Sequence, residues 1–324
     1  MKQPHPDHIN IVSGVRRLKA TEGDDGKRLD QFLSHHLPEL SRGQWRKVID
    51  LGGTHHNGRR TRKCGLLISS GDLVEAYLDG RSLTPYRVQP EDVLYHDRFV
   101  LALNKPPDVE TQPTHARYVG TLYEAIKKWQ IDQAGKSNRH TALGMVQRLD
   151  RGTSGLILFS THEQAHAGLT RSFTDRTVKK VYLALVQGHL CGKGEFRSLL
   201  ARSRKRNIVK SVKAGGKEAI TRYEALESNK DCSLIKVEPL TGRSHQIRVH
   251  FSEAGYPLLG DDRYGGPTLY QGFQLQRHML HALSLELEHP VSKEYLKLSA
   301  PLPSDMHQLL ESLSWHTSLS CYGE

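Results

Sequence analysis

Short apolar segments separated by turn-forming residues dominate the chain after residue 92 and restrict how this part can fold. Strand-like runs occur at residues 99–104, 156–159, 180–187, 219–225 and 233–237. Apolar residues at helical spacing occur at 121–129, 163–173 and 244–254. The mixture of strands and helices predicts an α+β domain, and the sequence contains no internal repeat that would favour a solenoid.

The segment 26–80 has a different pattern, with two short helices followed by a hairpin. Apolar residues of the first helix recur at Leu29, Phe32, Leu33 and Leu37. Ser41 and Gln44 form a capping-box pattern that begins the second helix, and Gly52 ends it. Asn57-Gly58 predicts a tight hairpin turn before another strand at 73–78.

These patterns predict two domains joined by a short linker. Residues 1–25 lack apolar periodicity and are expected to form a loose arm, followed by the small domain at 26–80. Residues 81–91 contain Pro85 and Pro90 and are expected to be the linker. The larger domain is then predicted to span 92–324.

The charge balance favours a polyanionic partner. The 324 residues include 46 Lys and Arg against 35 Asp and Glu, a net charge of +11. Basic residues concentrate in two stretches, 42–63 and 197–217, and the second stretch contains no acid. A solvated surface is the alternative interpretation of either stretch. Candidate phosphate-binding residues are Arg42, Arg46, Lys47, Arg204, Lys205 and Arg206.

Composition also limits the compartment and the cofactors. No apolar run is long enough for a membrane span or a signal peptide, so a cytoplasmic protein is expected, with a monomer as the default. The four cysteines are far apart and predict reduced thiols. The histidines at 245, 250, 278 and 281 lack the spacing of a helical metal site, so no metal is expected.

A polar loop at 147–155 directly precedes the apolar run 156–159. Within it, Asp150 lies between Arg148 and Arg151, and opposite charge favours the ionised carboxylate. Gly152 and Gly155 permit a tight turn or a close approach of substrate. On the charge pattern alone, a surface ion pair in a turn is the simpler interpretation.

Two resemblances change these interpretations. The segment 26–80 resembles the αL RNA-binding module first recognised in a small-subunit ribosomal protein, on Arg28-Leu29-Asp30, Ser41-Arg42, the glycine stop and Asn57-Gly58. Residues 92–303 resemble the RluA-type pseudouridine synthases. The blocks that carry this second resemblance are, in order, Asn104-Lys105-Pro106, Arg148-Leu149-Asp150 with Thr153-Ser154-Gly155, residues 176–184 around Tyr182, Thr241-Gly242-Arg243-Ser244-His245-Gln246-Ile247-Arg248, residues 255–261, and Leu280-His281-Ala282.

The second resemblance implies an isomerase that detaches uracil from its ribose in RNA, turns it and rejoins it through carbon-5. It also implies a largely antiparallel sheet with flanking helices. The reaction needs no redox change, so no cofactor is expected. Asp150 matches the essential carboxylate, acting either as a nucleophile on the sugar or as a base. Arg248 matches its basic partner, Tyr182 the residue that stacks on uracil, and Arg148 the residue that helps extract the base.

The resemblance leaves the target open. Gln147 stands where family members commonly have His, and Thr111-Gln112 replaces the usual Val-His, which weakens any transfer of target specificity. Large-subunit ribosomal RNA is the favoured substrate, with transfer RNA as the alternative. A noncatalytic RNA-binding or ribosome-assembly factor is the competing hypothesis, against which the presence of Asp150, Tyr182 and Arg248 together argues.

Overall fold

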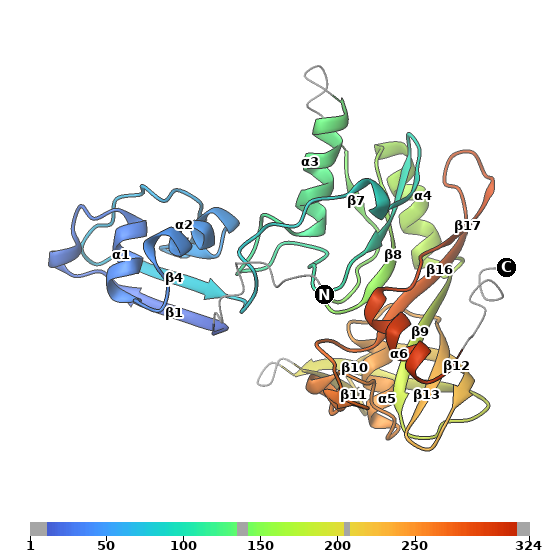
Figure 1. Cartoon of the computed structure of the whole chain (residues 1–324). Coiled ribbons are helices and arrows are strands. Elements are labelled where there is room, and N and C mark those ends of the chain that lie inside the picture. Colours follow the sequence, from blue (N-terminus) through green and yellow to red (C-terminus); the bar gives the residue numbers. More distant parts are fainter. Residues whose placement is uncertain (1–11, 135–141, 204–207, 316–324) are drawn as a thin grey trace. The chain divides into compact units, whose positions relative to one another are not determined.

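The computed structural model describes residues 12–134, 142–203 and 208–315, and the chain divides into two compact units. The first unit takes residues 1–88 and 110–138. The second takes residues 89–109 and 139–324. Figure 1 shows both units, with the N-terminal elements in blue and the C-terminal ones in red.

The first unit packs two short helices on a four-stranded antiparallel sheet of strand order β1-β4-β2-β3. Its core contains Phe32, Trp45 and Ile49, all fully buried. The capping box that begins α2 is present, because the Ser41 hydroxyl accepts the Gln44 amide. The elements are β1 Gly14–Lys19, α1 Leu29–His36, α2 Arg42–Leu51, β2 Thr54–His56, β3 Arg59–Thr61, β4 Leu73–Leu78 and α3 Leu122–Ala134.

Two boundaries of this unit differ from the sequence prediction. Residues 14–24, expected in a loose arm, form β1 and a short 3-10 helix. β1 is held by backbone hydrogen bonds to β4. Such pairing does not require a periodic pattern of apolar residues, so the sequence shows no sign of this strand. The sequence places residues 110–134 in the larger domain, but they belong to the first unit. Ion pairs of Arg117 with Asp79 at 2.9 Å and of Arg81 with Glu110 at 2.7 Å bind them there.

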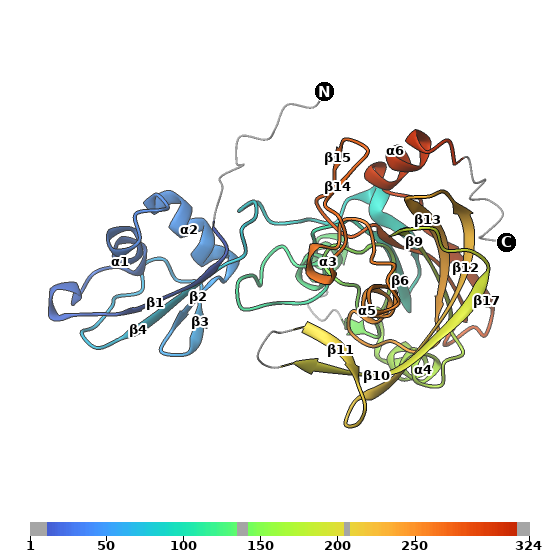
Figure 2. The same ribbon diagram turned by 90° about the horizontal axis from the view of Figure 1, so that it is seen from below.

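The second unit is built on an eleven-stranded sheet of main order β11-β10-β12-β13-β9-β16-β8-β6-β5, with β17 on β16 and β7 on β8 (Figures 1 and 2). Among the strands that the structure describes, only β16 and β8 pair in parallel, so the predicted α+β fold with a largely antiparallel sheet is confirmed. The strands are β5 Val93–His96, β6 Val100–Lys105, β7 Gly144–Met145, β8 Ser154–Ser160, β9 Lys179–Gln187, β10 Lys193–Ser203, β11 Ile208–Val212, β12 Lys217–Ser228, β13 Cys232–Pro239, β16 Leu280–Glu288 and β17 Tyr295–Ser299.

Helices cover both faces of this sheet, and the period-two alternation of its strands decides which residues meet them. In β9, Leu183 packs in a cluster with Leu309 of α6, whereas Ala184 packs with Phe251 of α5. The helices are α4 Glu163–Thr174, α5 Gln246–Glu253 and α6 Ser304–Ser312, and a two-stranded ribbon joins β14 Leu269–Tyr270 to β15 Phe273–Gln274.

The acid-free basic stretch at 197–217 is largely sheet. Its described residues include most of β10, all of β11 and the turn into β12, and β10 and β11 form an antiparallel pair at one edge of the sheet. Polar contacts fix this edge to α5, because the Ser198 hydroxyl lies 3.0 Å from His250 Nε2 and the Ser211 amide donates to Glu253 at 2.9 Å. No described helix has the length and apolar character needed to cross a membrane.

Candidate active site

The loop that carries Asp150 is the turn that leads into β8. All seven residues of β8 are buried, so this strand fixes the end of the loop. Within the turn, the Thr153 amide donates to the Asp150 carbonyl at 3.0 Å. Leu149 is buried, Arg148 is exposed, and the Asp150 side chain is 26% exposed. The carboxylate is therefore held on a defined backbone while remaining accessible.

Two buried cations hold the loop by its carbonyl oxygens. The Lys105 ammonium is fully buried and donates to the Arg151 carbonyl at 3.0 Å. Arg277 donates from Nη1 to the Gly152 carbonyl at 2.9 Å. Arg277 is itself oriented by a bidentate pair with Asp305 at 2.7 and 2.8 Å. The backbone on the C-terminal side of Asp150 thus cannot shift without breaking charge-assisted hydrogen bonds.

Two buried histidines fix the start of β8. The Thr153 hydroxyl lies 2.8 Å from His278 Nε2, and the Ser154 hydroxyl lies 2.9 Å from His281 Nδ1. His281 Nε2 donates to the Ala300 carbonyl, so Nδ1 accepts from Ser154. Burial lowers the pKa of His281 to about 4 and lowers that of His278 well below its ordinary value. Both rings are neutral near pH 7 and act as hydrogen-bonding supports.

Gly155 is required where β8 meets β16. Its φ is +107°, and a Cβ at this position would lie 2.2 Å from the Ala282 carbonyl oxygen. Only glycine allows the two strands to approach this closely, so the neighbour that requires Gly155 is the backbone of β16, whereas the sequence suggested a tight turn or an approaching substrate.

Arg248 lies in α5 and bridges two carboxylates. Its Nη1 donates to Asp150 at 2.9 Å, while Nε and Nη2 donate to the two oxygens of Asp261 at 2.7 Å each. The Arg248 and Asp261 side chains are 8% and 1% exposed. Although burial opposes the charged form, the hydrogen bonds and charge of Asp261, together with Asp150, raise the pKa of Arg248. The guanidinium is therefore a permanent positive charge beside Asp150.

The start of α5 is set by the side chain of Gln246, two residues before Arg248. Its amide oxygen accepts from the Thr241 hydroxyl at 2.6 Å and from the Arg243 amide at 3.0 Å. Its amide nitrogen donates to the Ile220 carbonyl of β12 at 2.9 Å. All these partners are provided by the fold, so Gln246 anchors the helix to the sheet.

Tyr182 lies in β9, where it is paired with Ala282 of β16, and Ala282 is in turn paired with Gly155 of β8. It is half-buried. Burial, with a further contribution from the Asp150 charge, raises the pKa of the Tyr182 phenol. The hydroxyl is therefore protonated at neutral pH, and its pKa responds to the negative charge of the Asp150 carboxylate.

The sequence profile of the RNA pseudouridylate synthase family matches residues 99–253, a range that includes Asp150, Tyr182 and Arg248. A protein of Bacillus subtilis named uncharacterized RNA pseudouridine synthase YlyB is 33% identical over 299 residues, covering 91% of this chain and 97% of YlyB. The chain belongs to the RNA pseudouridine synthase family. Ribosomal large subunit pseudouridine synthase D of Zymomonas mobilis is also 33% identical, covering 92% of this chain and 98% of that protein.

The solved structure of human RNA pseudouridylate synthase domain containing 4 has the same fold. It is 22% identical to this synthase, with a TM-score of 0.57, and the match covers 68% of this chain and 92% of the human one. The family match and the relatives confirm the predicted reaction class: the synthase is an isomerase that converts uridine to pseudouridine in RNA. Asp150 and Arg248, predicted as a pair, lie in direct contact.

Three further residues of this synthase's site received no role from the sequence. Asp261 was part of a recognised block, but nothing in the pattern indicated its bidentate bond to Arg248. Lys105 likewise belongs to a block, and a lysine between an apolar strand and a proline was the available signal. Arg277 has no such signal, because its partners Gly152 and Asp305 are distant in the sequence.

The predicted RNA-binding arginines of the first unit surround a buried acid. Asp30 is fully buried, and the Nε atoms of Arg28, Arg42 and Arg46 lie 3.3, 3.1 and 3.5 Å from its carboxylate. Although burial opposes it, hydrogen bonds from Arg42 and Arg28 lower the pKa of Asp30. Three cations on one anion leave a net positive cluster at the surface. Lys47 is exposed on α2, the helix that also carries Arg42 and Arg46.

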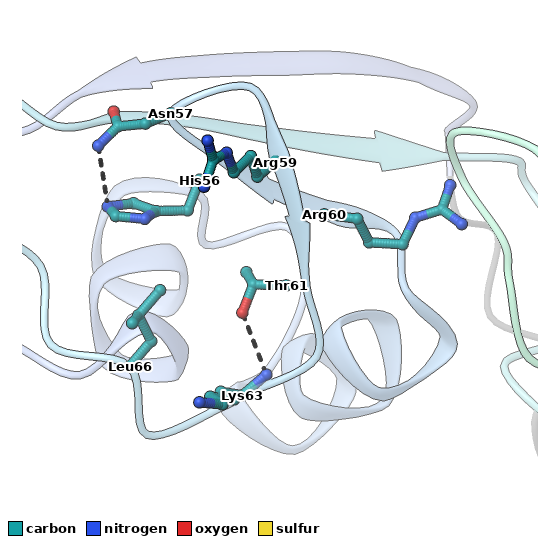
Figure 3. Close-up of a pocket in the computed structure, with 7 residues that line it drawn as sticks. All are labelled: His56, Asn57, Arg59, Arg60, Thr61, Lys63 and Leu66. Carbon is teal, nitrogen blue, oxygen red and sulfur yellow. Dashed lines mark hydrogen bonds between the residues drawn. The ribbon is translucent and has the colours of Figure 1, made fainter.

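A hollow of about 730 Å³ lies beside the β2–β3 hairpin of this unit (Figure 3). Basic groups form part of its lining, which comprises His56, Asn57, Arg59, Arg60, Thr61, Lys63 and Leu66. In Figure 3 the Arg60 side chain extends away from His56 and Leu66, and its guanidinium lies 5.8 Å from the Tyr118 ring centre.

The remaining predicted RNA-binding residues of the synthase are placed differently. Arg148 is exposed next to Asp150. Arg204, Lys205 and Arg206 lie outside the described residues. Across residues 12–134, 142–203 and 208–315, no group of three or more His, Cys, Asp or Glu side chains is arranged to hold a metal ion.

Proposed function

We propose that this synthase isomerises uridines in large-subunit ribosomal RNA, acting as a monomer in the cytoplasm. Relatives from Zymomonas mobilis and Vibrio parahaemolyticus that match about nine tenths of the chain are named ribosomal large subunit pseudouridine synthase D. The net charge of +11 suits a large polyanion. Because the target is inferred from relatives' names, transfer RNA is the alternative that the experiment must separate.

In this proposal Asp150 is the catalytic carboxylate, and its contact with Arg248 is the observation that carries the assignment. The N1–C1′ bond of uridine breaks and a C5–C1′ bond forms, with loss of the carbon-5 proton and gain of a proton at N1. Asp150 acts on the ribose, as nucleophile or base. Arg248 compensates the carboxylate charge and, being tied to Asp261, keeps that charge in one position.

Tyr182 is assigned to the base. Its ring stacks on the extracted uracil, and its hydroxyl takes part in removing the carbon-5 proton. Because the raised pKa keeps the phenol protonated, the hydroxyl must hand on its own proton when it receives another. Tyr182→Phe should therefore keep RNA affinity while lowering kcat by about 10² or more. A loss of affinity with unchanged kcat would contradict the assignment.

We further propose that residues 26–80 form an αL-type RNA-binding module. The arginine cluster on Asp30 is the supporting feature, because a buried acid that holds three guanidinium groups by Nε leaves other nitrogens of each available for phosphate. Arg42→Gln with Arg46→Gln should weaken RNA binding and reduce its salt dependence, without changing kcat at saturating RNA.

Arg148 is assigned to extraction of the target uridine, because it is exposed immediately beside Asp150. Swinging a base out of a stack costs a few kcal/mol. Arg148→Ala should lower activity on a structured RNA more than on an unstructured one. Equal losses on both would argue against extraction.

The test of the whole proposal is tritium release from [5-³H]uridine-labelled RNA. Large-subunit ribosomal RNA and transfer RNA are supplied separately to the purified protein, with Asp150→Asn as the matched control. The proposal is supported if ribosomal RNA releases tritium with the wild-type protein and not with Asp150→Asn. Release from transfer RNA alone would show that transfer RNA, and not ribosomal RNA, is the substrate. RNA binding without release from either would favour the noncatalytic factor.

A further inference from the structure

His245 lies beside Asp150 and has no role in the assignments above. It immediately precedes α5, and its backbone has φ 54° and ψ 18°, in the left-handed region that non-glycine residues seldom adopt. The side chain is 13% exposed and points its Nε2 at Asp150 Oδ2 from 3.8 Å. A strained residue that faces the catalytic carboxylate is a candidate for a substrate contact.

The proton on the His245 ring is placed by Tyr264. The Tyr264 hydroxyl accepts a hydrogen bond from the Val209 amide at 3.2 Å and lies 2.7 Å from His245 Nδ1. Val209 already donates to the hydroxyl oxygen, so we assign the single phenol proton to the bond with Nδ1, an arrangement that leaves the imidazole proton facing the Asp150 carboxylate. Nδ1 is then the acceptor, so the ring carries its own proton on Nε2. Burial lowers the pKa of His245, which favours this neutral form.

The Tyr264 ring is fixed independently of its hydroxyl. The Arg248 guanidinium carbon lies 4.9 Å from the ring centre, within cation–π range. Tyr264 thus contacts both the guanidinium that binds Asp150 and the imidazole that faces it. It is a positioning residue, because it reaches the site only through these two neighbours.

The Nε2–H group of His245 faces Asp150 but makes no hydrogen bond with it. At 3.8 Å the two atoms are too far apart for a hydrogen bond, whereas Arg248 already donates to the same Oδ2 at 2.9 Å. The proposed function requires the ribose of the target uridine to meet Asp150, since the carboxylate acts at C1′ or C2′. A donor this close to the carboxylate can reach an oxygen on the adjacent sugar carbon.

We propose that His245, held in its Nε2-protonated form by Tyr264, donates a hydrogen bond to the 2′-hydroxyl of the target uridine. The residue thereby makes the site selective for ribose over deoxyribose, because the 2′-hydroxyl is the group that distinguishes RNA from DNA. This inference rests on the proposed function, because it needs a uridine bound at Asp150.

The test is a double cycle between protein and substrate. A synthetic hairpin containing a uridine mapped as a target carries either [5-³H]uridine or [5-³H]2′-deoxyuridine at that position, and tritium release and filter binding are both measured. His245→Asn is the main variant: asparagine tolerates the left-handed backbone and places an amide near the Nδ1 position but has no group at the Nε2 position. His245→Gln restores a donor near Nε2.

With the ribose substrate, His245→Asn should lower kcat/KM about fivefold to tenfold, the value of one hydrogen bond. With the deoxy substrate, it should match the wild type within about twofold, because the partner is already absent. His245→Gln should recover most of the loss. Tyr264→Phe, which keeps the ring over Arg248, should reduce the ribose preference in the same way without weakening RNA affinity for the rest of the hairpin.

Equal losses on both substrates would overturn the inference, as would a His245→Gln variant no better than His245→Asn at equal thermal stability. If the deoxy substrate is not turned over by any variant, the same comparison is made on its binding constants. Failure of the wild type to release tritium from the ribose hairpin, by contrast, contradicts the proposed function. The two failures are therefore distinguishable.

Discussion

Removal of Arg248 should destabilise the second unit much more than removal of Asp150. Arg248→Met leaves the Asp261 carboxylate, 1% exposed, without the two donors that now lie at 2.7 Å. Breaking a buried pair from one side costs about 3 to 5 kcal/mol. Asp150→Ala leaves Arg248 still paired with Asp261 and removes a side chain that is 26% exposed, so it should cost about 1 kcal/mol or less.

Asp261→Asn completes a cycle with Arg248→Met. Alone it should cost about 1 to 3 kcal/mol, since one acceptor remains for the guanidinium. In the double variant no buried charge is left unpaired, so its cost should be about 2 kcal/mol smaller than the sum of the two single costs. Amide hydrogen exchange in α5 and β16 measures these free energies within the second unit, independently of the first.

The same variants should also differ in catalytic activity. Asp150→Ala should abolish tritium release with nearly unchanged exchange protection, whereas Asp261→Asn should lower kcat with RNA affinity kept. Additive costs for Arg248→Met and Asp261→Asn within about 0.5 kcal/mol would refute the coupling argued from the geometry. So would an Asp150→Ala variant as unstable as Arg248→Met.

The other predictions concern the supports of the Asp150 loop. Gly155→Ala places a methyl group 2.2 Å from the Ala282 carbonyl oxygen and should destabilise the second unit by about 3 kcal/mol, seen as a lower Tm. Lys105→Met removes the donor to the Arg151 carbonyl, so hydrogen exchange in the loop should rise and kcat should fall more than RNA affinity; an unchanged kcat would exclude this support. The pKa of His281 is about 4 in the folded state against 6.5 when unfolded, so its contribution is complete above pH 6.5 and is lost as the pH falls to 4. His281→Asn should flatten this part of the stability profile, which amounts to at most about 3 kcal/mol, and a profile of unchanged slope would contradict it.

The sequence by itself determined the parts of this protein that depend on neighbours in the chain. Helix α2 begins and ends where Ser41, Gln44 and Gly52 predict, since caps act within one turn. The apolar run that follows Asp150 is a buried strand, as its composition predicts. The blocks around Asp150, Tyr182 and Arg248 sufficed for the family, which the comparisons confirm, while the individual roles of these residues stay predictions.

Tertiary structure decided the features that join distant segments. β16 lies between β9 and β8 and pairs with β8 in parallel, a register that backbone hydrogen bonds set and local periodicity cannot reveal. For the same reason the sequence predicts a loose arm where β1 forms, and it places residues 110–134 in the wrong unit. Asp261, Tyr264 and the left-handed backbone of His245 acquire meaning only when α5 packs beside Asp150. Their interactions have short range in space but long separation in the chain, and only folding brings their atoms within that range.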